Sequence, residues 1–529
     1  MDRHQVAVAR IAATVRGFFE RKEPFRIFHG SSNSTRPAVL GAKTVDISAL
    51  RNVIAVDPAR RVALVEPNVP MDRLVESTLV PHGLVPPVVM EFPGITAGGG
   101  FAGTAGESSS FRHGFFDASV ERVEMVLADG EVVEATPDGE RADLFRAAAG
   151  AVGTLGVTTL LQLKLMRAKK YVRTRYRRTY SVAELVQAVR QELSKAENDY
   201  VDGILFSKGH GVVITGSLTD SKPTEARPQT FSGAWDPWFY QHVRERTKKL
   251  VPSSTRCTAD SDSDSDSDSS VVTEYIPLAE YLFRYDRGGF WVGHAAFCYF
   301  LLPCTRFLRW FLDDFLHTRM LYRALHASGE SARFVVQDIA MPFETTEEFV
   351  DYVADEHGIW PLWLCPLKRR EPPTFHPFTT RPPQAAAGSE EVDAAEDMML
   401  NVGVWGWGPR DPAAFVAKNR QLEHKVRALG GMKWLYAHTY YRPDEFWAMY
   451  GGRGWYDALR RKYRAEALPT VWDKVHVDAA AAAKSKSKYW FTSIWPLGGL
   501  YGIYKGIQGK EYMSHRNATW KWRAGGDVV

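Results

Sequence analysis

The sequence has few cysteines and no cysteine or histidine spacing of the kind that binds a structural metal. Its four Cys residues form no CxxC pair, and no two of its 15 His residues stand in an HxH or HxxxH arrangement. Disulfide scaffolds and zinc sites built from neighbouring residues depend on such spacings. We therefore expect reduced, structural thiols and no bound metal.

The sequence also lacks a strong excess of charge of either sign. Its 66 Lys and Arg residues nearly balance 62 Asp and Glu residues, which leaves a net charge of +4 over 529 residues. Nucleic-acid binding needs a concentrated basic surface, so we expect no nucleic-acid partner. With 45% hydrophobic and 24% charged residues, the chain is typical of a globular protein with more than one core.

Tryptophan is absent from the first 234 residues, and all 16 Trp residues lie from Trp235 onward. Tryptophan supplies large apolar surfaces to cores and pockets. The two parts of the chain are therefore expected to serve different tasks.

Long apolar runs are absent as well. The two most apolar stretches, residues 288–304 and 489–504, contain Gly and Pro, and about 17 helical residues reach only about 25 Å of the roughly 30 Å hydrocarbon layer. We interpret 288–304 as a core segment or pocket wall. Residues 489–504 fit a buried helix and a membrane-interface segment equally well. The amphipathic residues 1–24 predict a helix packed on the first domain rather than a transit peptide.

Short β segments, tight turns and small helices alternate through residues 25–170, which predicts an α+β fold. One strand pair turns at Asp57-Pro58, and a hairpin turns at Asp129-Gly130. Periodicity predicts helices at 71–79, 143–149 and 181–195, and further strands at 156–165 and around 203–216.

Three stretches of biased composition interrupt this pattern. The Ser-Asp run at 259–270 cannot bury apolar surface, so we expect a solvated loop or a phosphorylatable acidic patch. Residues 382–397 are a second expected loop. The predicted organisation is an N-terminal helix at 1–24, a first domain at 25–200, a second domain at 201–475 with a disordered loop at 254–271, and a linker with an apolar tail at 476–529.

The densest motif is the glycine-rich segment 93–110, PGITAGGGFAGTAGESSS. It contains a formal GxGxxG, but the strand and helix that a Rossmann fingerprint requires do not flank it. We expect instead a loop whose backbone N–H groups face an anion such as a pyrophosphate. Residues 29–36 and 149–159 are two further loops of small residues. Each alone is compatible with an ordinary turn, but three within 130 residues suit an extended dinucleotide.

Several segments resemble one flavoprotein family. They include GESSSFRHGFF (106–116), VEMVLADGEVVEATP (123–137), VVQDIAMP (335–342) and WLYAHTYYRPDEFWAMYGG (434–452). Over residues 10–475 the chain resembles the delta-24-sterol reductase family, also called Diminuto, Dwarf or seladin proteins. The resemblance implies a two-subdomain FAD-binding domain of the PCMH (vanillyl-alcohol-oxidase) type, followed by an α+β substrate (cap) domain with an aromatic-rich sheet. It further implies reduction of the 24,25 double bond of a sterol side chain, with NADPH as the reductant of FAD.

The same resemblance assigns residues to FAD. Because His29 precedes the glycine of the first loop, we expect FAD to be bound non-covalently. Arg36, Lys169 and Lys170 are possible partners of phosphates or merely solvated cations. The expected FAD-binding residues are Thr96, Ala97, Gly98, Gly99, Gly100, Phe101, Ala102, Gly103, Thr104, Ala105, Gly106, Glu107, Ser108, Gly153, Thr154 and Gly156.

Reduction of an isolated alkene requires a proton donor beside the flavin, and Tyr, Glu, Asp and His suit that role. Asp338 and Tyr441 are the first choices, with His438 as a third catalytic candidate. Further candidates are Tyr440, Glu107 and Tyr456. The Trp-containing stretches 360–366 and 402–408 fit either a sterol-pocket wall or core strands.

Alternatives remain open at this point. A flavin oxidase or dehydrogenase of a sugar lactone or hydroxy acid would share the fold, and a non-catalytic scaffold or stress-binding protein is a third class. The family implies the endoplasmic reticulum membrane. Its N-terminal anchor precedes the helix that residues 5–20 resemble, so we expect peripheral or tail-associated attachment, with a cytosolic location as the alternative. The sequence carries no signal of oligomeric state.

Overall fold

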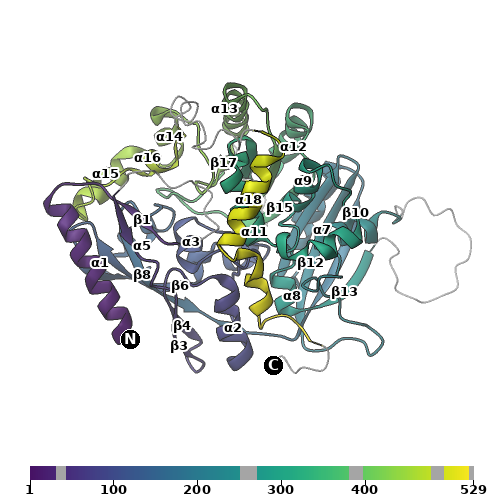
Figure 1. Ribbon diagram of the computed structural model, residues 1–529, viewed down its shortest axis with the longest axis horizontal. Coiled ribbons are helices and arrows are strands. Elements are labelled where there is room, and N and C mark those ends of the chain that lie inside the picture. The colour runs from purple at the N-terminus through teal and green to yellow at the C-terminus, as the bar shows by residue number, and fades with distance from the viewer. Residues whose placement is uncertain (31–42, 251–270, 380–396, 478–493, 524–529) are drawn as a thin grey trace, which may run out of the picture.

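A computed structural model describes residues 1–30, 43–250, 271–379, 397–477 and 494–523. Most of the first predicted loop (31–36), the Ser-Asp run, nearly all of the predicted loop at 382–397 and the start of the apolar tail lie outside the described residues. The described part contains two main antiparallel sheets with helices around them, which confirms the α+β fold (Figure 1).

The first sheet has five strands, in the spatial order β3-β4-β8-β6-β7. Both predicted strand pairs are confirmed, because β3 pairs with β4 and β6 pairs with β7. Gly130 in the hairpin has φ 86°, and a Cβ there would lie 2.7 Å from the carbonyl oxygen of Ala12 in the N-terminal helix. The strands are β3 (Val53–Asp57), β4 (Val62–Val65), β6 (Val120–Leu127), β7 (Val132–Ala135) and β8 (Gly156–Lys164).

Several helices of the described residues lie around this sheet. The N-terminal helix packs Val8, Ile11 and Val15 on the domain, as its periodicity predicted. Two short strand pairs complete this part of the chain. The helices include α1 (Asp2–Glu20), α2 (Met71–His82) and α5 (Ala142–Ala148), and the extra pairs are β1 (Arg26–Phe28) with β2 (Thr44–Asp46) and β5 (Leu84–Val85) with β9 (Met166–Arg167).

The second sheet has eight strands, in the order β13-β10-β12-β11-β15-β16-β14-β17. The chain passes from the first sheet to the second between β9 and β10, so the predicted boundary at residue 200 falls inside the second sheet. Strand β10 belongs to the second sheet because it pairs with β12 and β13. The strands are β10 (Tyr171–Thr179), β11 (Tyr200–Ser207), β12 (His210–Thr219), β13 (Val271–Pro277), β14 (Phe334–Met341), β15 (Leu362–Lys368), β16 (Met398–Trp407) and β17 (Met432–Lys433).

Helices cover both faces of the second sheet. One face packs with α6 (Val182–Leu193), α12 (Thr346–Tyr352) and α13 (Pro412–Ala428) into a separate core. The other face contacts the first domain and further helices, among which α18 lies alongside α11 (Figure 1). These are α7 (Phe239–Thr247), α8 (Leu278–Leu282), α9 (Val292–Tyr299), α10 (Arg306–Phe311), α11 (Thr318–Ser328) and α18 (Leu497–Gln508).

The last helices before the tail return to the first domain. They are α14 (Pro443–Met449), α15 (Arg453–Lys462) and α16 (Val471–Val475). Lys462 pairs with Asp143 of α5 at 2.6 Å. No helix in the described part of the chain combines the length and apolarity that crossing a membrane requires.

Candidate functional site

The glycine-rich segment folds partly as a short helix, α3 (Ala97–Ala102), rather than as a continuous loop. Thr96 caps it, because its Oγ1 accepts a hydrogen bond from the N–H of Gly99 at 3.1 Å. Glycine is required here by close packing. A Cβ on Gly98 would lie 2.6 Å from the Cβ of Pro67, and one on Gly100 would lie 2.4 Å from Cε of Met90. The segment is thus pressed against its own domain.

The third predicted loop contacts both the glycine-rich segment and β1, the strand that precedes the first loop. A Cβ on Gly150, in the third loop, would lie 2.9 Å from Cγ2 of Thr104 in the glycine-rich segment. A Cβ on Gly153 would lie 2.6 Å from Cδ1 of Ile27, just before the first loop. Arg36 lies outside the described residues. Segments far apart in the sequence therefore meet at one place.

The C-terminal helices hold the third loop in position. The hydroxyl of Tyr456 donates a hydrogen bond to Oγ1 of Thr154 at 2.7 Å. Nζ of Lys474 donates to the carbonyl oxygen of Val152 at 2.8 Å. Gly156 has φ 153°, and a Cβ there would lie 2.7 Å from the carbonyl oxygen of Val126. These residues fit a flavin dinucleotide, because adjoining backbone loops of small residues and hydroxyls permit several close approaches to an extended, anionic ligand.

A buried acid faces the glycine-rich segment from the second sheet. Asp338 of β14 is 8% exposed, and its carboxylate accepts hydrogen bonds from Nδ2 of Asn401 at 3.1 Å and from the hydroxyl of Tyr436. Burial raises the pKa of Asp338 above its usual value. The Cβ of Tyr436 lies 3.8 Å from the position that a Cβ on Gly103 would take. Tyr436 therefore connects the acid to the predicted FAD segment.

Tyr436 and Asn401 are site residues that the sequence did not single out. Asn401 lies near Asp338 because β14 and β16 pair with Ala340 opposite Asn401. Tyr436 follows Trp434, whose Nε1 donates to the carbonyl oxygen of Thr104 at 2.8 Å. Both neighbours depend on strand register and on packing between the domains, so no local sequence signal marks them.

A second buried acid lies within the FAD segment itself. Burial, reinforced by the charge of Glu91, raises the pKa of Glu107 well above its usual value. Glu91 forms an ion pair with Arg284 at 2.6 Å, and Arg284 also pairs with Asp202 at 3.0 Å. Nη2 of Arg284 lies 3.4 Å from Oγ of Ser108. This fully buried network binds the end of the FAD segment to the second sheet.

The structure does not place His438 with Asp338. Asp338 and Gln337 are consecutive in β14, so their side chains point to opposite faces. Nε2 of Gln337 donates to the carbonyl oxygen of His438 at 3.3 Å, on the face covered by α13. The ring of Tyr441 lies 5.8 Å from Nζ of Lys433, and its buried hydroxyl makes no hydrogen bond with any described residue. Tyr441 thus keeps an uncommitted hydroxyl but has no described contact with Asp338.

The basic pair proposed for phosphates lies elsewhere. Nζ of Lys169 forms an ion pair with Asp220 at 2.6 Å, and the backbone N–H of Lys170 donates to the same carboxylate. Both contacts lie at the ends of β10 and β12. These lysines therefore connect two neighbouring strands of the second sheet and have no described contact with the glycine-rich segment.

An apolar cavity of about 310 Å³ lies between α9, α11 and α18. It is an apolar, aromatic-lined pocket in the Trp-rich part of the chain, but no residue of the predicted wall 360–366 lines it. Of the Trp residues in the predicted walls, Trp407 lines the cavity, whereas Trp363 and Trp405 pack around Phe290 in the core. Other lining residues are Tyr299, Phe300, Met320, Leu321 and Phe334.

Helix α11 lies between this cavity and the buried acid. Leu321 lines the cavity, and the ring of its neighbour Tyr322 packs against Phe92 and Trp405. Burial raises the pKa of Tyr322, and the charge of Asp338 adds to that effect. The helix is tied to the first domain by Arg319, which donates two hydrogen bonds to Asp72 of α2. The acid, the FAD segment and the apolar cavity are therefore arranged around one helix.

Comparisons with known proteins agree with this arrangement. A family model described as an FAD binding domain matches residues 7–136. The chain is 30% identical over 440 residues to Delta(24)-sterol reductase of Homo sapiens, which covers 80% of this chain and 76% of that protein. It is 28% identical over 451 residues to Delta(24)-sterol reductase of Arabidopsis thaliana (80% and 74%). Cytokinin dehydrogenase 4 of Oryza sativa subsp. japonica matches at 30% over 237 residues, 42% of this chain and 44% of that protein.

Proposed function

The chain belongs to the Delta(24)-sterol reductase family, and from this membership we propose that it is an FAD-dependent reductase of the 24(25) double bond of sterols. The observation that carries the proposal is the similarity over 80% of the chain, together with the FAD-binding family match over residues 7–136, which contains the glycine-rich segment. No observation favours the alternative of a lactone or hydroxy-acid oxidase. Cytokinin dehydrogenase matches 42% of the chain, about half the share that the sterol reductases match.

FAD, when bound and reduced, supplies a hydride to one alkene carbon. The protein must deliver a proton to the other carbon. Asp338 is our choice of proton donor, because burial favours its neutral form and its carboxyl is oriented by Asn401 and Tyr436. Tyr436 positions that carboxyl beside the FAD segment. Tyr441 is the second choice, since its buried hydroxyl is not committed to a described partner.

The proposed cofactor contacts follow the loops described above. The segment from Thr96 to Ser108, together with Gly153, Thr154 and Gly156, would hold FAD non-covalently, and Lys474 adds a cation to the third loop. We assign NADPH as the reductant on the family resemblance alone. Reduction of bound FAD by NADPH, followed as bleaching of the flavin band, tests this assignment, and equal rates with NADH would reject the preference.

The apolar cavity beside α11 is the proposed binding site for part of the sterol. Its lining offers aromatic and aliphatic contacts, as a fused-ring hydrocarbon requires. Leu325 and Phe334 line both this cavity and a small pocket of about 30 Å³ that reaches Gln337 and His438. That pocket reaches the face of β14 opposite to Asp338, whereas Phe334, which lines the cavity, lies on the same face of β14 as Asp338.

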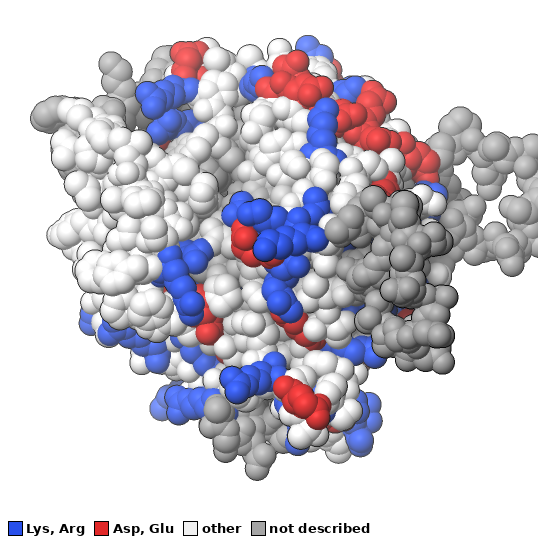
Figure 2. All heavy atoms as spheres, turned by 90° about the vertical axis from the view of Figure 1, so that its right-hand side faces the viewer, with Lys and Arg blue, Asp and Glu red and all other residues white. Residues whose placement is uncertain are grey.

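We further propose peripheral attachment to the endoplasmic reticulum membrane through the surface around the cavity. Apolar side chains of α10, α18 and the turn after α9 are exposed there, an arrangement typical of a lipid-contacting surface. Figure 2 shows a broad area without charged side chains on its left, which corresponds to the front of Figure 1, where α18 lies. The exposed residues are Leu301, Leu302, Phe307, Phe311, Leu497, Leu500, Tyr504 and Ile507, and the exposed Lys510 follows α18.

One experiment tests the main proposal. The purified chain is incubated with FAD, NADPH and desmosterol, and the sterol is analysed by mass spectrometry. We expect a product heavier by two hydrogens, formed only when both FAD and NADPH are present. Unchanged desmosterol, with FAD demonstrably bound, would reject the reductase activity. Failure to bind FAD at all would instead favour the scaffold alternative.

A further inference from the structure

The chain that follows α18 connects the two domains. We call residues 509–523 the C-terminal strap. The ring of Trp520 in this strap is buried and packs against Phe283, just after α8, with the ring centroids 4.8 Å apart. The backbone N–H of Thr519 donates a hydrogen bond to Glu76 of α2. The strap therefore contacts the second domain and the first within a few residues.

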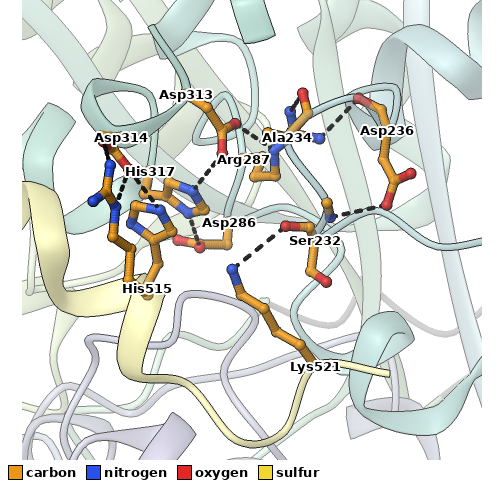
Figure 3. Close-up of polar contacts among 12 residues, drawn as sticks. Ser232, Ala234, Asp236, Asp286, Arg287, Asp313, Asp314, His317, His515 and Lys521 are labelled. Carbon is orange, nitrogen blue, oxygen red and sulfur yellow. Dashed lines mark hydrogen bonds and ion pairs between the residues drawn. The ribbon is translucent and has the colours of Figure 1, made fainter. Parts of the chain in front are cut away.

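The strap is held by an imidazole ring that stacks on a second imidazole ring. His515, in a 3-10 segment of the strap (Glu511–Asn517), places its ring against that of His317, with centroids 3.7 Å and planes 12° apart. His317 precedes α11, and its ring nitrogens lie 2.6 Å from Oδ2 of Asp286 and 3.5 Å from Oδ2 of Asp313. Figure 3 shows His317 with both carboxylates and the ring of His515 beside it.

His317 carries the positive charge of this stacked pair. Although burial opposes it, the charge and hydrogen bond of Asp286, together with those of Asp313, raise the pKa of His317 above its usual value. An imidazole that faces a carboxylate at each nitrogen satisfies both of them only in its protonated form, in which both nitrogens donate. His317 is therefore an imidazolium in acidic and near-neutral solution.

His515 is neutral while the strap is docked. Its Nε2 lies 3.0 Å from Oδ1 of Asp314, whereas its Nδ1 is buried and makes no hydrogen bond with any described residue. Burial, reinforced by the charge of His317, lowers the pKa of His515 well below its usual value. A proton on His515 would place a second cation against the imidazolium of His317.

The charged groups around His515 do not favour its protonation. Asp314 also accepts a hydrogen bond from Nε of Arg516 at 3.0 Å, and the charge of Lys521 lowers the pKa of His515 further. The two carboxylates that hold His317 act in the opposite direction but are already paired. The groups that face His515 are Asp286, Arg287, Asp313, Asp314, His317, Arg516 and Lys521.

We propose that the C-terminal strap is a pH-sensitive closure of the apolar cavity: it docks while His515 is neutral and is released when His515 gains a proton. A released His515 has the ordinary histidine pKa of about 6.5, so the released strap binds more protons than the docked one. Docking is therefore complete above about pH 6.5 and weakens about tenfold for each pH unit below it. The inference goes beyond the sterol activity and does not depend on it.

Release of the strap would free one end of the helix that closes the cavity. Helix α18 lines the cavity with Leu500 and Ile503. Its start is held by Trp495, whose Nε1 donates to the carbonyl oxygen of Tyr299 at 2.7 Å. Its other end continues directly into the strap (Figure 1). Protonation of His515 would therefore loosen the far end of α18 while its start stays attached.

Hydrogen–deuterium exchange of the full chain at pH 7.5 and pH 5.5 tests the proposal, with each rate divided by that of the unfolded chain at the same pH. We expect the protection of peptides from the strap to fall roughly tenfold, and that of α18 to fall with it. Helix α6, in the core on the opposite face of the second sheet, should keep its protection.

Variants identify the group that titrates. His515→Gln has no nitrogen to protonate, so its strap should be equally protected at both pH values. Arg516→Gln is the matched control, because it removes the neighbouring hydrogen bond to Asp314 and leaves His515 able to titrate. Its strap should lose protection roughly tenfold, like that of the unmodified protein.

A second variant keeps the test valid if His515→Gln leaves the strap undocked at both pH values. His515→Phe keeps an aromatic ring on the imidazolium of His317, so its strap should stay protected at pH 5.5. A fall in protection in His515→Phe as large as in the unmodified protein would assign the titration to another group and overturn the proposal. Unchanged protection of the strap in the unmodified protein between the two pH values would overturn it as well.

Discussion

The hydroxyl of Tyr456 donates a hydrogen bond to Oγ1 of Thr154 over 2.7 Å, although the two residues are 302 positions apart. Oγ1 of Thr154 in turn donates to the carbonyl oxygen of Ala151 at 2.8 Å. The proton of Tyr456 is thus engaged in holding the third small-residue loop. Tyr456, a candidate proton donor from its sequence context, is better explained as a support of the proposed FAD site.

Removing this support should weaken FAD binding. A neutral hydrogen bond contributes about 0.5 to 1.5 kcal/mol, so we expect Tyr456→Phe to raise the dissociation constant of FAD roughly three- to tenfold. Titration by flavin fluorescence quenching measures this. Tyr463→Phe is the control, because its hydroxyl bonds to Asp143 away from the loop. Equal effects of the two changes would show that the loop contact is not responsible.

Asp338→Asn should abolish proton delivery while FAD stays bound. General acid catalysis contributes about 10² to 10⁴-fold, so single-turnover reduction of desmosterol should slow by at least about a hundredfold. The rate of FAD reduction by NADPH should not change. Tyr436→Phe should give a smaller loss, because it removes only the positioning hydrogen bond.

The control for Asp338→Asn and Tyr436→Phe is Asp351→Asn, which removes a surface ion pair with Lys208. It should leave sterol reduction at the unmodified rate. If Asp338→Asn reduces desmosterol as fast as this control, the donor lies elsewhere, and Tyr441→Phe becomes the next variant to measure.

The buried His4 should make the stability of the first domain depend on pH. Hydrogen bonds that its ring nitrogens donate to Glu124 and Glu66 raise its pKa from 6.5 to about 9. Because the folded pKa exceeds the unfolded one, the stabilisation is complete below about pH 6.5 and is lost as the pH rises through about 9. The difference in unfolding free energy between the unmodified protein and His4→Gln should shrink by roughly 1 to 3 kcal/mol across this range.

Urea unfolding at pH 6 and at pH 9.5 measures that difference. Arg122→Gln serves as the control, because its partner Glu134 is exposed and such pairs contribute little. A gap between the unmodified protein and His4→Gln that is constant with pH would contradict the assignment of the raised pKa to the carboxylates.

Close packing of α18 on α11 should be sensitive to a single methyl group. Gly502→Ala places a Cβ against backbone at Ala324, so α18 must shift, and we expect a loss of about 1 to 3 kcal/mol together with weaker sterol binding. Gly454→Ala, in a helix with open space around it, should be neutral or stabilising. Thermal unfolding and sterol binding of both variants test this. Equal stability of the two would exclude a tight α11–α18 contact.

The proposed membrane surface can be tested by vesicle flotation. Leu301→Asp combined with Phe311→Asp replaces two side chains that are 76% and 67% exposed, and should reduce binding to vesicles containing anionic lipid at least about tenfold. Val132→Asp, at an exposed apolar position of the first domain, should bind like the unmodified protein. No loss of binding in the double variant would place the membrane contact elsewhere.

Local patterns in the sequence predicted the local structure well. Asp129-Gly130 marked its hairpin because the turn geometry itself requires a glycine with positive φ. The glycine-rich segment, which was expected to be a loop, is partly helical, since a Thr96 cap and contacts with Pro67 and Met90 fold it onto its domain. The boundary between the two sheets was less predictable from the sequence. Strand β10 belongs to the second sheet because it pairs with β12 and β13, and its own residues do not indicate that pairing.

The sequence by itself determined the fold class, the family and the identity of Asp338 as a candidate acid, because composition, periodicity and motifs are properties of neighbouring residues. Only the tertiary structure decided which Trp residues line a cavity and which hydroxyl orients Asp338. Tyr436 and Trp407 acquire these roles from strand register and helix packing. Such contacts join residues far apart in the chain, and no local pattern encodes them.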